Sequence, residues 1–225
     1  VSSSVRKVLA VKAGMAVPEA SSCLILQCGW RDSAFSTLSM LRGFDNCITH
    51  PKHHFAVIDL TEKKAQEKLN MVRTAYFSGP DHPDPAVALA WKEIHKRIKI
   101  TRDNDGEIRF SNGSRVEAGI TFRGGTPQEM LISEFGPIAA EDGKRADEIV
   151  EGAIGSVPMT GRITIETTYK GGRFGRCYHI ATLAMNAVGR ELTPLDWDFF
   201  FFAWWEHPNC FLPGEHHTFS GETLT

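Results

Sequence analysis

The stretch EMLISEFG (residues 129–136) decides how this chain is interpreted. Its apolar run, Met130 to Ile132, has the length of a buried strand, and the run stops at Ser133 and Glu134. A buried carboxylate is costly unless it is solvated, paired or at work on a ligand. Glu134 is therefore either a catalytic base at a strand tip or the first polar residue of a loop.

Strand-like and helix-like segments alternate around this stretch. Short apolar runs predict further strands at CLILQC (23–28), FAVIDL (55–60), RITIET (162–167) and within DWDFFFFAWWEHPNC (196–210). Helical periodicity predicts helices over 36–47, 61–77, 86–98, 138–154 and 178–189. Thr61 is a candidate N-cap. The alternation predicts an α/β fold with a mainly parallel sheet flanked by helices.

Between residues 99 and 122 the pattern is that of an inserted β-hairpin arm. The turn sequences NDG (104–106) and SNGS (111–114) separate short alternating segments, which is a strong hairpin signal. The glycine-rich turn RGGTPQ (123–128) then leads into the strand at 129–133.

The length of 225 residues allows one domain, or one domain and a small extension. The fractions of hydrophobic (42%) and charged (23%) residues are those of a globular protein. A net charge of −2 gives no general attraction to nucleic acid, so any DNA contact rests on local patches. Five scattered cysteines fit reduced thiols. No run approaches the roughly 18 apolar residues of a membrane helix, and Lys12 interrupts the N-terminal apolar run. An intracellular protein is expected.

The loop GWRDSAFST (29–37) follows a predicted strand and leads into a helix, which is where a phosphate-binding loop belongs. Ser36 and Thr37 offer hydroxyls for Mg²⁺. The full signature is absent, because Ala34 stands at the glycine position and Phe35 at the lysine position. On its own the loop is either a nucleotide site or an ordinary strand-to-helix turn.

Three other groups of residues have two interpretations each. The strand at 162–167 ends in Glu166-Thr167-Thr168, whose hydroxyls can sense a terminal phosphate or simply reflect β-propensity. The His/Cys clusters at 47–54 and 206–217 lack a paired C-x-x-C, which favours loop histidines over structural zinc. The basic, glycine-rich GGRFGR (171–176) suits a phosphate backbone or a plain surface loop.

Together these segments resemble the ATPase domain of phage terminase large subunits, the motors that pump DNA into capsids. The resemblance runs from about Cys23 to about Leu212 and lies in the order and spacing of several stretches. These are FAVIDLTEKKAQEKLNMVRTAYF (55–77), FSNGS (110–114), FRGGTPQEMLISEFG (122–136), RITIETTYKGG (162–172) and LDWDFFFFAWWEHPN (195–209). The resemblance implies a RecA-like P-loop NTPase fold that binds ATP and Mg²⁺.

The resemblance also implies residue roles. It places residues 29–37 at the Walker A position, 131–134 at the Walker B position and 166–168 at the coupling motif. The implied roles are water activation by Glu134, nucleotide binding by Arg31, Ala34, Ser36 and Thr37, coupling by Thr167 or Thr168, and Mg²⁺ contact by Ser36 and, indirectly, Ser133.

The chain departs from the family pattern at the lysine that binds the phosphates. The family places a lysine beside the Ser/Thr or at the start of the loop, where this chain has Phe35 and Gly29. Losing that charge weakens stabilisation of the transferred phosphate, unless Arg31 or a lysine from elsewhere compensates. Whether the chain hydrolyses ATP is therefore left open. We expect an atypical segment at 1–22, the ATPase domain at 23–195, and a final strand with the start of a linker to a missing nuclease at 196–225.

The implied function is ATP-driven translocation of double-stranded DNA into a capsid, by a truncated or impaired domain. The implied partners are a portal protein, a small terminase subunit and other copies in a homo-oligomeric ring, in the cytoplasm of a bacterial host and without a membrane. The alternative is a catalytically silent nucleotide-binding or assembly module left from a decayed prophage gene. A helicase is a third hypothesis, since the same core fold serves both helicases and packaging ATPases.

Overall fold

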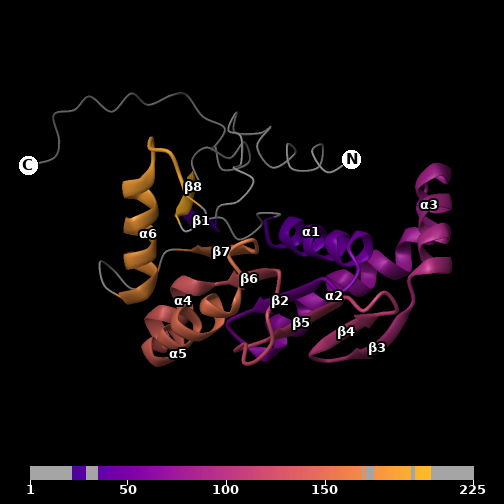
Figure 1. Ribbon diagram of the computed structural model, residues 1–225, viewed down its shortest axis with the longest axis horizontal. Coiled ribbons are helices and arrows are strands. Elements are labelled where there is room, and N and C mark those ends of the chain that lie inside the picture. Colours follow the sequence, from indigo (N-terminus) through magenta and orange to yellow (C-terminus); the bar gives the residue numbers. More distant parts are fainter. Residues whose placement is uncertain (1–21, 29–34, 169, 171–174, 194–195, 204–225) are drawn as a thin grey trace, which may run out of the picture.

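The computed structural model describes residues 22–28, 35–168, 170, 175–193 and 196–203. Within these residues one 8-stranded sheet has the order β3-β4-β5-β2-β6-β7-β1-β8 (Figure 1). The strands are β1 (Ser22–Cys28), β2 (His54–Ile58), β3 (Ile100–Asn104), β4 (Glu107–Phe110), β5 (Arg115–Gly119), β6 (Glu129–Ser133), β7 (Arg162–Thr168) and β8 (Trp197–Ala203).

The sheet is parallel from β5 through β2, β6, β7 and β1 to β8, and it is antiparallel only in the pairs β3–β4 and β4–β5. The predicted hairpin arm is confirmed as β3, β4 and β5. Gly113, in the turn between β4 and β5, has φ of 83°, a conformation that glycine adopts without strain. β8 pairs with β1 along its whole length and forms the other edge of the same sheet.

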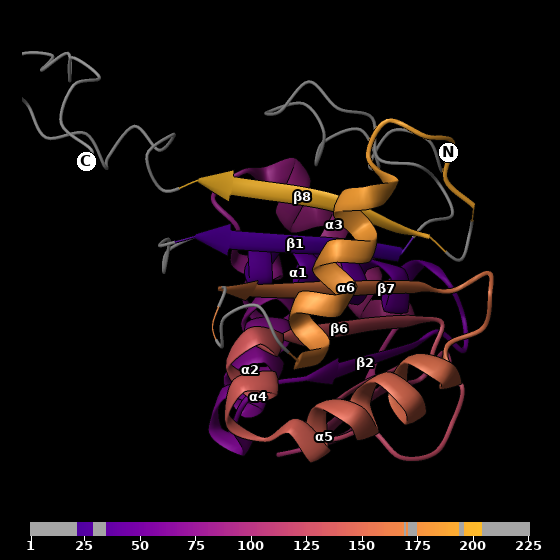
Figure 2. The ribbon, with the colours of Figure 1, turned by 90° about the vertical axis from the view of Figure 1, so that its left-hand side faces the viewer.

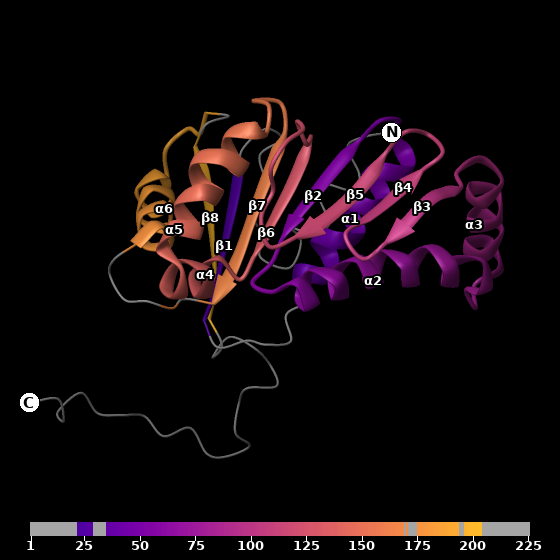
Figure 3. The ribbon, with the colours of Figure 1, turned by 90° about the horizontal axis from the view of Figure 1, so that it is seen from below.

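Helices cover both faces of the sheet. The helices α1 (Phe35–Thr49) and α2 (Glu62–Ser78) pack on one face; α4 (Phe135–Glu141), α5 (Gly143–Glu148) and α6 (Gly175–Ala187) pack on the other (Figure 2). The short 3-10 helix η1 (Gly79–Asp81) leads from α2 into α3 (Pro85–Arg97), which lies at the hairpin end of the molecule (Figures 1 and 3). The predicted α/β class is confirmed.

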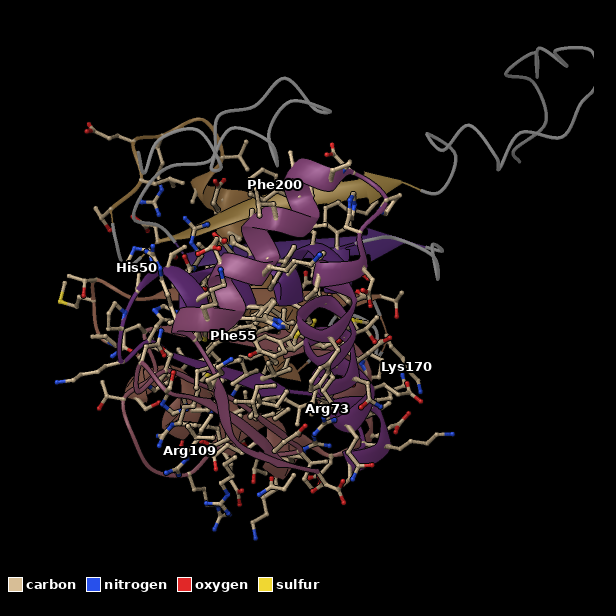
Figure 4. All side chains as sticks on the ribbon, turned by 90° about the vertical axis from the view of Figure 1, so that its right-hand side faces the viewer. His50, Phe55, Arg73, Arg109, Lys170 and Phe200 are labelled. Atoms are coloured by element: carbon tan, nitrogen blue, oxygen red, sulfur yellow. The ribbon has the colours of Figure 1, made fainter. Side chains whose placement is uncertain are left out.

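Burial on both faces explains why the central strands are continuous apolar runs. Along β2, Phe55 and Val57 join the core under α1 and α2, whereas Ala56 and Ile58 join the core under α4 and α6. Successive side chains of a strand point to opposite faces, so a strand covered on both sides needs no polar alternation. Phe55, only 1% exposed, lies at the centre of the molecule in Figure 4.

The carboxyl ends of the parallel strands meet at one edge of the sheet. The register pairs Ile58 with Ile132 across β2 and β6, and Ser133 with Glu166 across β6 and β7. Lys170, just past β7, lies at this edge, and His50 lies at the opposite edge (Figure 4). In open α/β sheets, ligands bind beyond the carboxyl ends of the strands, so polar residues that follow β2, β6 and β7 are placed for binding.

One of the predicted elements needs correction. The helix expected over 138–154 begins earlier, at Phe135, and is divided into α4, α5 and the π-helix η2 (Ile149–Ile154). The division falls at Asp142, whose side chain accepts a hydrogen bond from the backbone N–H of Arg145 at 3.0 Å and so caps a new helix. The tail strand expected over 196–210 is described only as β8; residues 204–210 lie outside the described residues.

Candidate active site at the carboxyl edge of the sheet

Glu134 connects β6 to α4 with no intervening loop. Its backbone is in the left-handed region, with φ 58° and ψ 37°, which is unusual for a residue with a Cβ. This conformation costs roughly 1–2 kcal/mol, and the packed strand and helix on either side hold it. The prediction that Glu134 lies at a strand tip is confirmed, and the tip is strained.

The side chain of Glu134 is half-buried and loosely paired. It is 33% exposed, and its Oε1 lies 3.7 Å from Nζ of Lys64 on α2. A carboxylate with one long ion pair and access to solvent keeps lone pairs available for a water molecule. The position is therefore suitable for a general base.

Glu166 joins four elements through one carboxylate oxygen. Its Oε1 accepts hydrogen bonds from the hydroxyl of Ser36 at the start of α1 and from the hydroxyl of Ser133 at the end of β6, the latter at 2.8 Å. Nζ of Lys68, on α2, lies 3.5 Å from the same oxygen. Glu166 itself, on β7, is 7% exposed. The structure thus brings the two predicted Mg²⁺-side serines together around Glu166, for which the sequence predicted no separate role.

Asp59 is a second buried acid at this edge. It follows β2, is 1% exposed, and has its Oδ2 3.8 Å from Nζ of Lys68. Burial raises the pKa of the Asp59 carboxyl, and the nearby Lys68 and the backbone N–H of Leu60 oppose that rise. Lys68, itself 9% exposed, is therefore a buried ammonium between two carboxylates, Asp59 and Glu166.

Arg145 of α5, on the face of the sheet opposite to α2, holds residues 59 and 60 after β2 in place. Its guanidinium donates to the backbone carbonyls of Asp59, Leu60 and Ile120, with distances of 2.9 Å to the latter two. Burial lowers the pKa of Arg145, and Asp142 and Asp59 oppose that fall. Asp59 is consequently held by backbone contacts rather than by a flexible loop.

Thr167 ties β7 to the helix that follows Glu134. Its Oγ1 accepts a hydrogen bond from the backbone N–H of Gly136 at 2.6 Å and donates to the carbonyl of Thr168 at 2.8 Å. Thr167 and Thr168 are therefore at the edge where the resemblance places a coupling motif, and Thr167 connects the end of β7 to the first turn of α4.

Of the other residues predicted to bind the nucleotide, the structure describes Thr37 but not Arg31 or Ala34. Thr37 is exposed on α1, next to Ser36. Arg31 and Ala34 lie outside the described residues, as do 171–174 of the glycine-rich loop and the histidine cluster at 206–217.

Sequence reasoning missed Lys68 and Asp59, although both carried a signal. Lys68 is a charged residue on the face of α2 that buries Ala65 and Leu69. Asp59 ends an apolar run just as Glu134 does.

One histidine near residue 50, His53, belongs to a different, structural network at the amino ends of the strands. Glu129, 2% exposed, accepts hydrogen bonds from Nε of Arg42 at 2.9 Å and from Asn46 at 2.7 Å, and Nε2 of His53 lies 3.6 Å from it. Burial would raise the pKa of Glu129, but Arg42 and these hydrogen bonds outweigh it and lower the pKa to about 2. Among the described residues, no group of three or more His, Cys, Asp or Glu is arranged to hold a metal ion.

Among the helices that the structure describes, none is long and apolar enough to cross a membrane.

The fold, a mostly parallel sheet with helices on both faces, is RecA-like. No protein-family model and no curated protein matches this chain in sequence. Solved structures match it in fold: the bacteriophage HK97 large terminase aligns with a TM-score of 0.56 and 11% identity, over 81% of this chain and 35% of that one. This chain thus spans about a third of the HK97 protein.

Two further matches are ATPase domains alone. The large terminase ATPase domain of Thermus phage P74-26 aligns with a TM-score of 0.53 and 14% identity, over 86% of this chain and 79% of that domain. An arginine-to-alanine mutant of that domain aligns with a TM-score of 0.53 and 12% identity, over 81% of this chain and 76% of that one. The fold is therefore the one found in the ATPase domains of phage large terminases, as the resemblance implied.

Proposed function

We propose that this chain is the ATPase domain of a phage large terminase and that it hydrolyses ATP at the carboxyl edge of its sheet. The observation that supports this best is the meeting of Ser36, Ser133 and Glu166 at that edge, with Glu134 one residue beyond Ser133. In this fold, a hydroxyl at a helix start and an acid at a neighbouring strand end are the groups that hold a magnesium nucleotide.

The donor set suits Mg²⁺ and ATP. Mg²⁺ takes oxygen ligands, and usually one or two carboxylates together with substrate phosphates and water. Ser36, Ser133 and Glu166 offer only oxygen, and Ser36 lies in the first turn of α1, where backbone N–H groups and the helix dipole favour an anion. ATP, when bound, would supply the phosphoanhydride bond that is broken, and Mg²⁺ would neutralise part of the charge of the phosphates. Glu134 would orient a water molecule and accept its proton as the water oxygen bonds to the γ-phosphorus and ADP leaves with the electrons of the broken bond.

Coupling to movement is proposed to pass through Thr167. Because this residue bonds to Gly136, two residues after Glu134, a change at the reacting edge is transmitted to β7. DNA translocation, a ring of copies, a portal protein and a small terminase subunit as partners, and action in the bacterial host's cytoplasm are all part of this proposal. Support for them comes from the large-terminase fold alone.

Phe35 favours one alternative. With a phenylalanine at the lysine position of the loop, the chain can be a silent module that binds nucleotide or assembles without turnover. ATP hydrolysis by the purified chain separates the two proposals. We expect Glu134→Gln to abolish hydrolysis while leaving MgATP binding intact. The control is Glu141→Gln, which changes an acid whose side chain is 54% exposed on α4. Binding without hydrolysis by the unchanged chain supports the silent nucleotide-binding module. Absence of any nucleotide binding contradicts the ATPase and leaves a module that only assembles.

A further inference from the structure

Two charges expected at a magnesium-nucleotide site are absent from their usual positions in this chain. Phosphate loops carry a lysine that reaches the β- and γ-phosphates, and the neighbouring strand ends in an acid that helps hold Mg²⁺. Here those positions are occupied by Phe35 and Ser133. The structure places a carboxylate against Ser133 and against Ser36, the residue after Phe35, and an ammonium beside that carboxylate.

The carboxylate is Glu166, one strand away from the usual position. Ser133 and Glu166 are directly paired across the parallel strands β6 and β7. The hydroxyls of Ser36 and Ser133 both donate to Oε1 of Glu166. The acid that usually ends the strand at the position of Ser133 lies beside the serine that contacts Mg²⁺. Glu166, which accepts a hydrogen bond from that serine, Ser36, has the same neighbour. Glu166 therefore occupies the environment of the missing acid from the adjacent strand.

The ammonium is Lys68 of α2. Its side chain is 11% exposed, and its Nζ lies 3.5 Å from Oε1 of Glu166 and 3.8 Å from Oδ2 of Asp59. Both distances exceed the roughly 2.7–2.9 Å of a close ammonium–carboxylate hydrogen bond. An ammonium has three donors, so Lys68 is held in place by charge while it keeps hydrogen-bonding capacity for another anion.

Lys64, one turn earlier on α2, is a weaker candidate for the same role. Its side chain is 43% exposed, and it lies 3.7 Å from the carboxylate of Glu134. Water screens a charge at that depth, whereas a buried ammonium acts at much lower effective dielectric. Lys68 also shares its carboxylate partner with Ser36 and Ser133, which Lys64 does not.

We propose that Lys68 and Glu166 are the charged pair of the nucleotide site, with Lys68 facing the phosphates and Glu166 facing the magnesium ion. They replace, from α2 and β7, the lysine that Phe35 does not provide and the acid that Ser133 does not provide. The assignment rests on the proposed function. Without nucleotide the two residues neutralise each other; a bound magnesium nucleotide gives Glu166 a cation and Lys68 an anion, so one ion pair is exchanged for two.

Nucleotide affinity tests the pair, measured with a fluorescent ATP analogue in Mg²⁺ and again in EDTA. We expect Glu166→Gln to remove the gain in affinity that Mg²⁺ gives, and Ser133→Asp with Glu166→Gln to restore it. We expect Lys68→Met to weaken binding roughly tenfold to hundredfold in both conditions, as loss of a charge-assisted hydrogen bond does. Adding Phe35→Lys to Lys68→Met should recover that loss.

Folding is controlled separately, because Lys68→Met leaves two buried acids without their cation. The double variant Lys68→Met with Glu166→Gln removes both charges of the pair together and leaves only Asp59 without its cation. Adding Phe35→Lys and Ser133→Asp to it should rebuild the site. Lys96→Met and Glu93→Gln are the matched controls. These residues form a 2.5 Å ion pair on α3, which lies far from β7 in both Figure 1 and Figure 3. Thermal melting of every variant identifies those that fold.

The outcomes are distinct. Wild-type affinity and wild-type Mg²⁺ dependence in both Lys68→Met and Glu166→Gln overturn this assignment alone. A Glu166→Gln variant that loses affinity equally in Mg²⁺ and in EDTA overturns the metal-facing role. Failure of the unchanged chain to bind any nucleotide overturns the assignment together with the proposed function.

Discussion

Oγ1 of Thr167 lies 2.6 Å from the backbone nitrogen of Gly136 and accepts its hydrogen bond. This contact joins the end of β7 to the first turn of α4, two residues after Glu134. A Cβ on Gly136 would lie 2.4 Å from the carbonyl oxygen of Thr168, so only glycine allows the approach. The candidate base and the candidate coupling residue are thus parts of one rigid junction.

Removing the hydroxyl of Thr167 should loosen that junction. Thr167→Ala leaves the N–H of Gly136 buried without an acceptor, so we expect the free energy of unfolding to fall by about 1–3 kcal/mol. Turnover should fall more than nucleotide affinity, because the contact positions Glu134 and not the phosphates. Urea denaturation and steady-state ATPase assays measure the two effects. Thr167→Ser, which keeps the hydroxyl, is the control; an alanine variant as stable and active as wild type would contradict the prediction.

Filling the space at Gly136 should be worse than removing the hydroxyl. Gly136→Ala forces the backbone of α4 away from β7, and overpacking of this kind costs about 1–3 kcal/mol or more. Gly152→Ala is the matched control, because a Cβ there meets nothing within 4 Å. Thermal melting compares the two alanine variants. Equal melting temperatures would show that the junction tolerates displacement.

The sequence was sufficient to predict most of the helices and strands, and to place Glu134 at the end of β6. Strands covered on both faces are continuous apolar runs, and amphipathic helices keep their period, so both were predictable from local pattern. The break at Asp142 was missed because α4, α5 and η2 together keep a helical character over 135–154. An aspartate followed by glycine there was the available signal of a new N-cap.

The centre of the candidate site was not predictable from spacing. Ser36 and Glu166 are 130 residues apart, and Lys68 and Glu166 are 98 residues apart, so their contacts depend on strand order and register. The sequence alone could not say that Glu166 faces Ser133 on the neighbouring strand. Polar residues on otherwise buried faces, such as Lys68 on α2, mark such contacts without identifying the partner.

The left-handed backbone at Glu134 lowers the stability of the fold, and we expect that a glycine there would raise stability but abolish ATP hydrolysis. Glu134→Gly relieves a left-handed conformation that costs roughly 1–2 kcal/mol, partly offset by the greater backbone freedom of glycine in the unfolded chain. We expect a net gain of up to about 1 kcal/mol in the free energy of unfolding, with loss of ATP hydrolysis. Lys52→Gly is the control, because Lys52 is exposed and has φ of 62°; it should gain stability without losing turnover. A glycine variant at 134 that is less stable than wild type would mean that the side chain of Glu134 also supports the fold.

The Glu129 network predicts a specific loss of stability in acid. The pKa of Glu129 is lowered from 4.5 to about 2 because Arg42, His53 and Asn46 outweigh the effect of burial. Since the folded pKa lies below the unfolded value, the ionised carboxylate stabilises the fold above the unfolded pKa. That contribution, about 3 kcal/mol by linkage, is lost as the pH falls from 4.5 toward 2.

Urea denaturation over a series of pH values from about 6 to about 3 measures this contribution. Glu129→Gln should be less stable than wild type at the upper end of the series, and the difference should shrink as the pH falls, because wild type loses the stabilisation that the variant never had. Glu141→Gln, at an exposed acid on α4, should follow the wild-type profile. Parallel profiles for wild type and Glu129→Gln would mean that Glu129 titrates alike in the folded and unfolded chains, and that the Arg42 contact does not hold its charge.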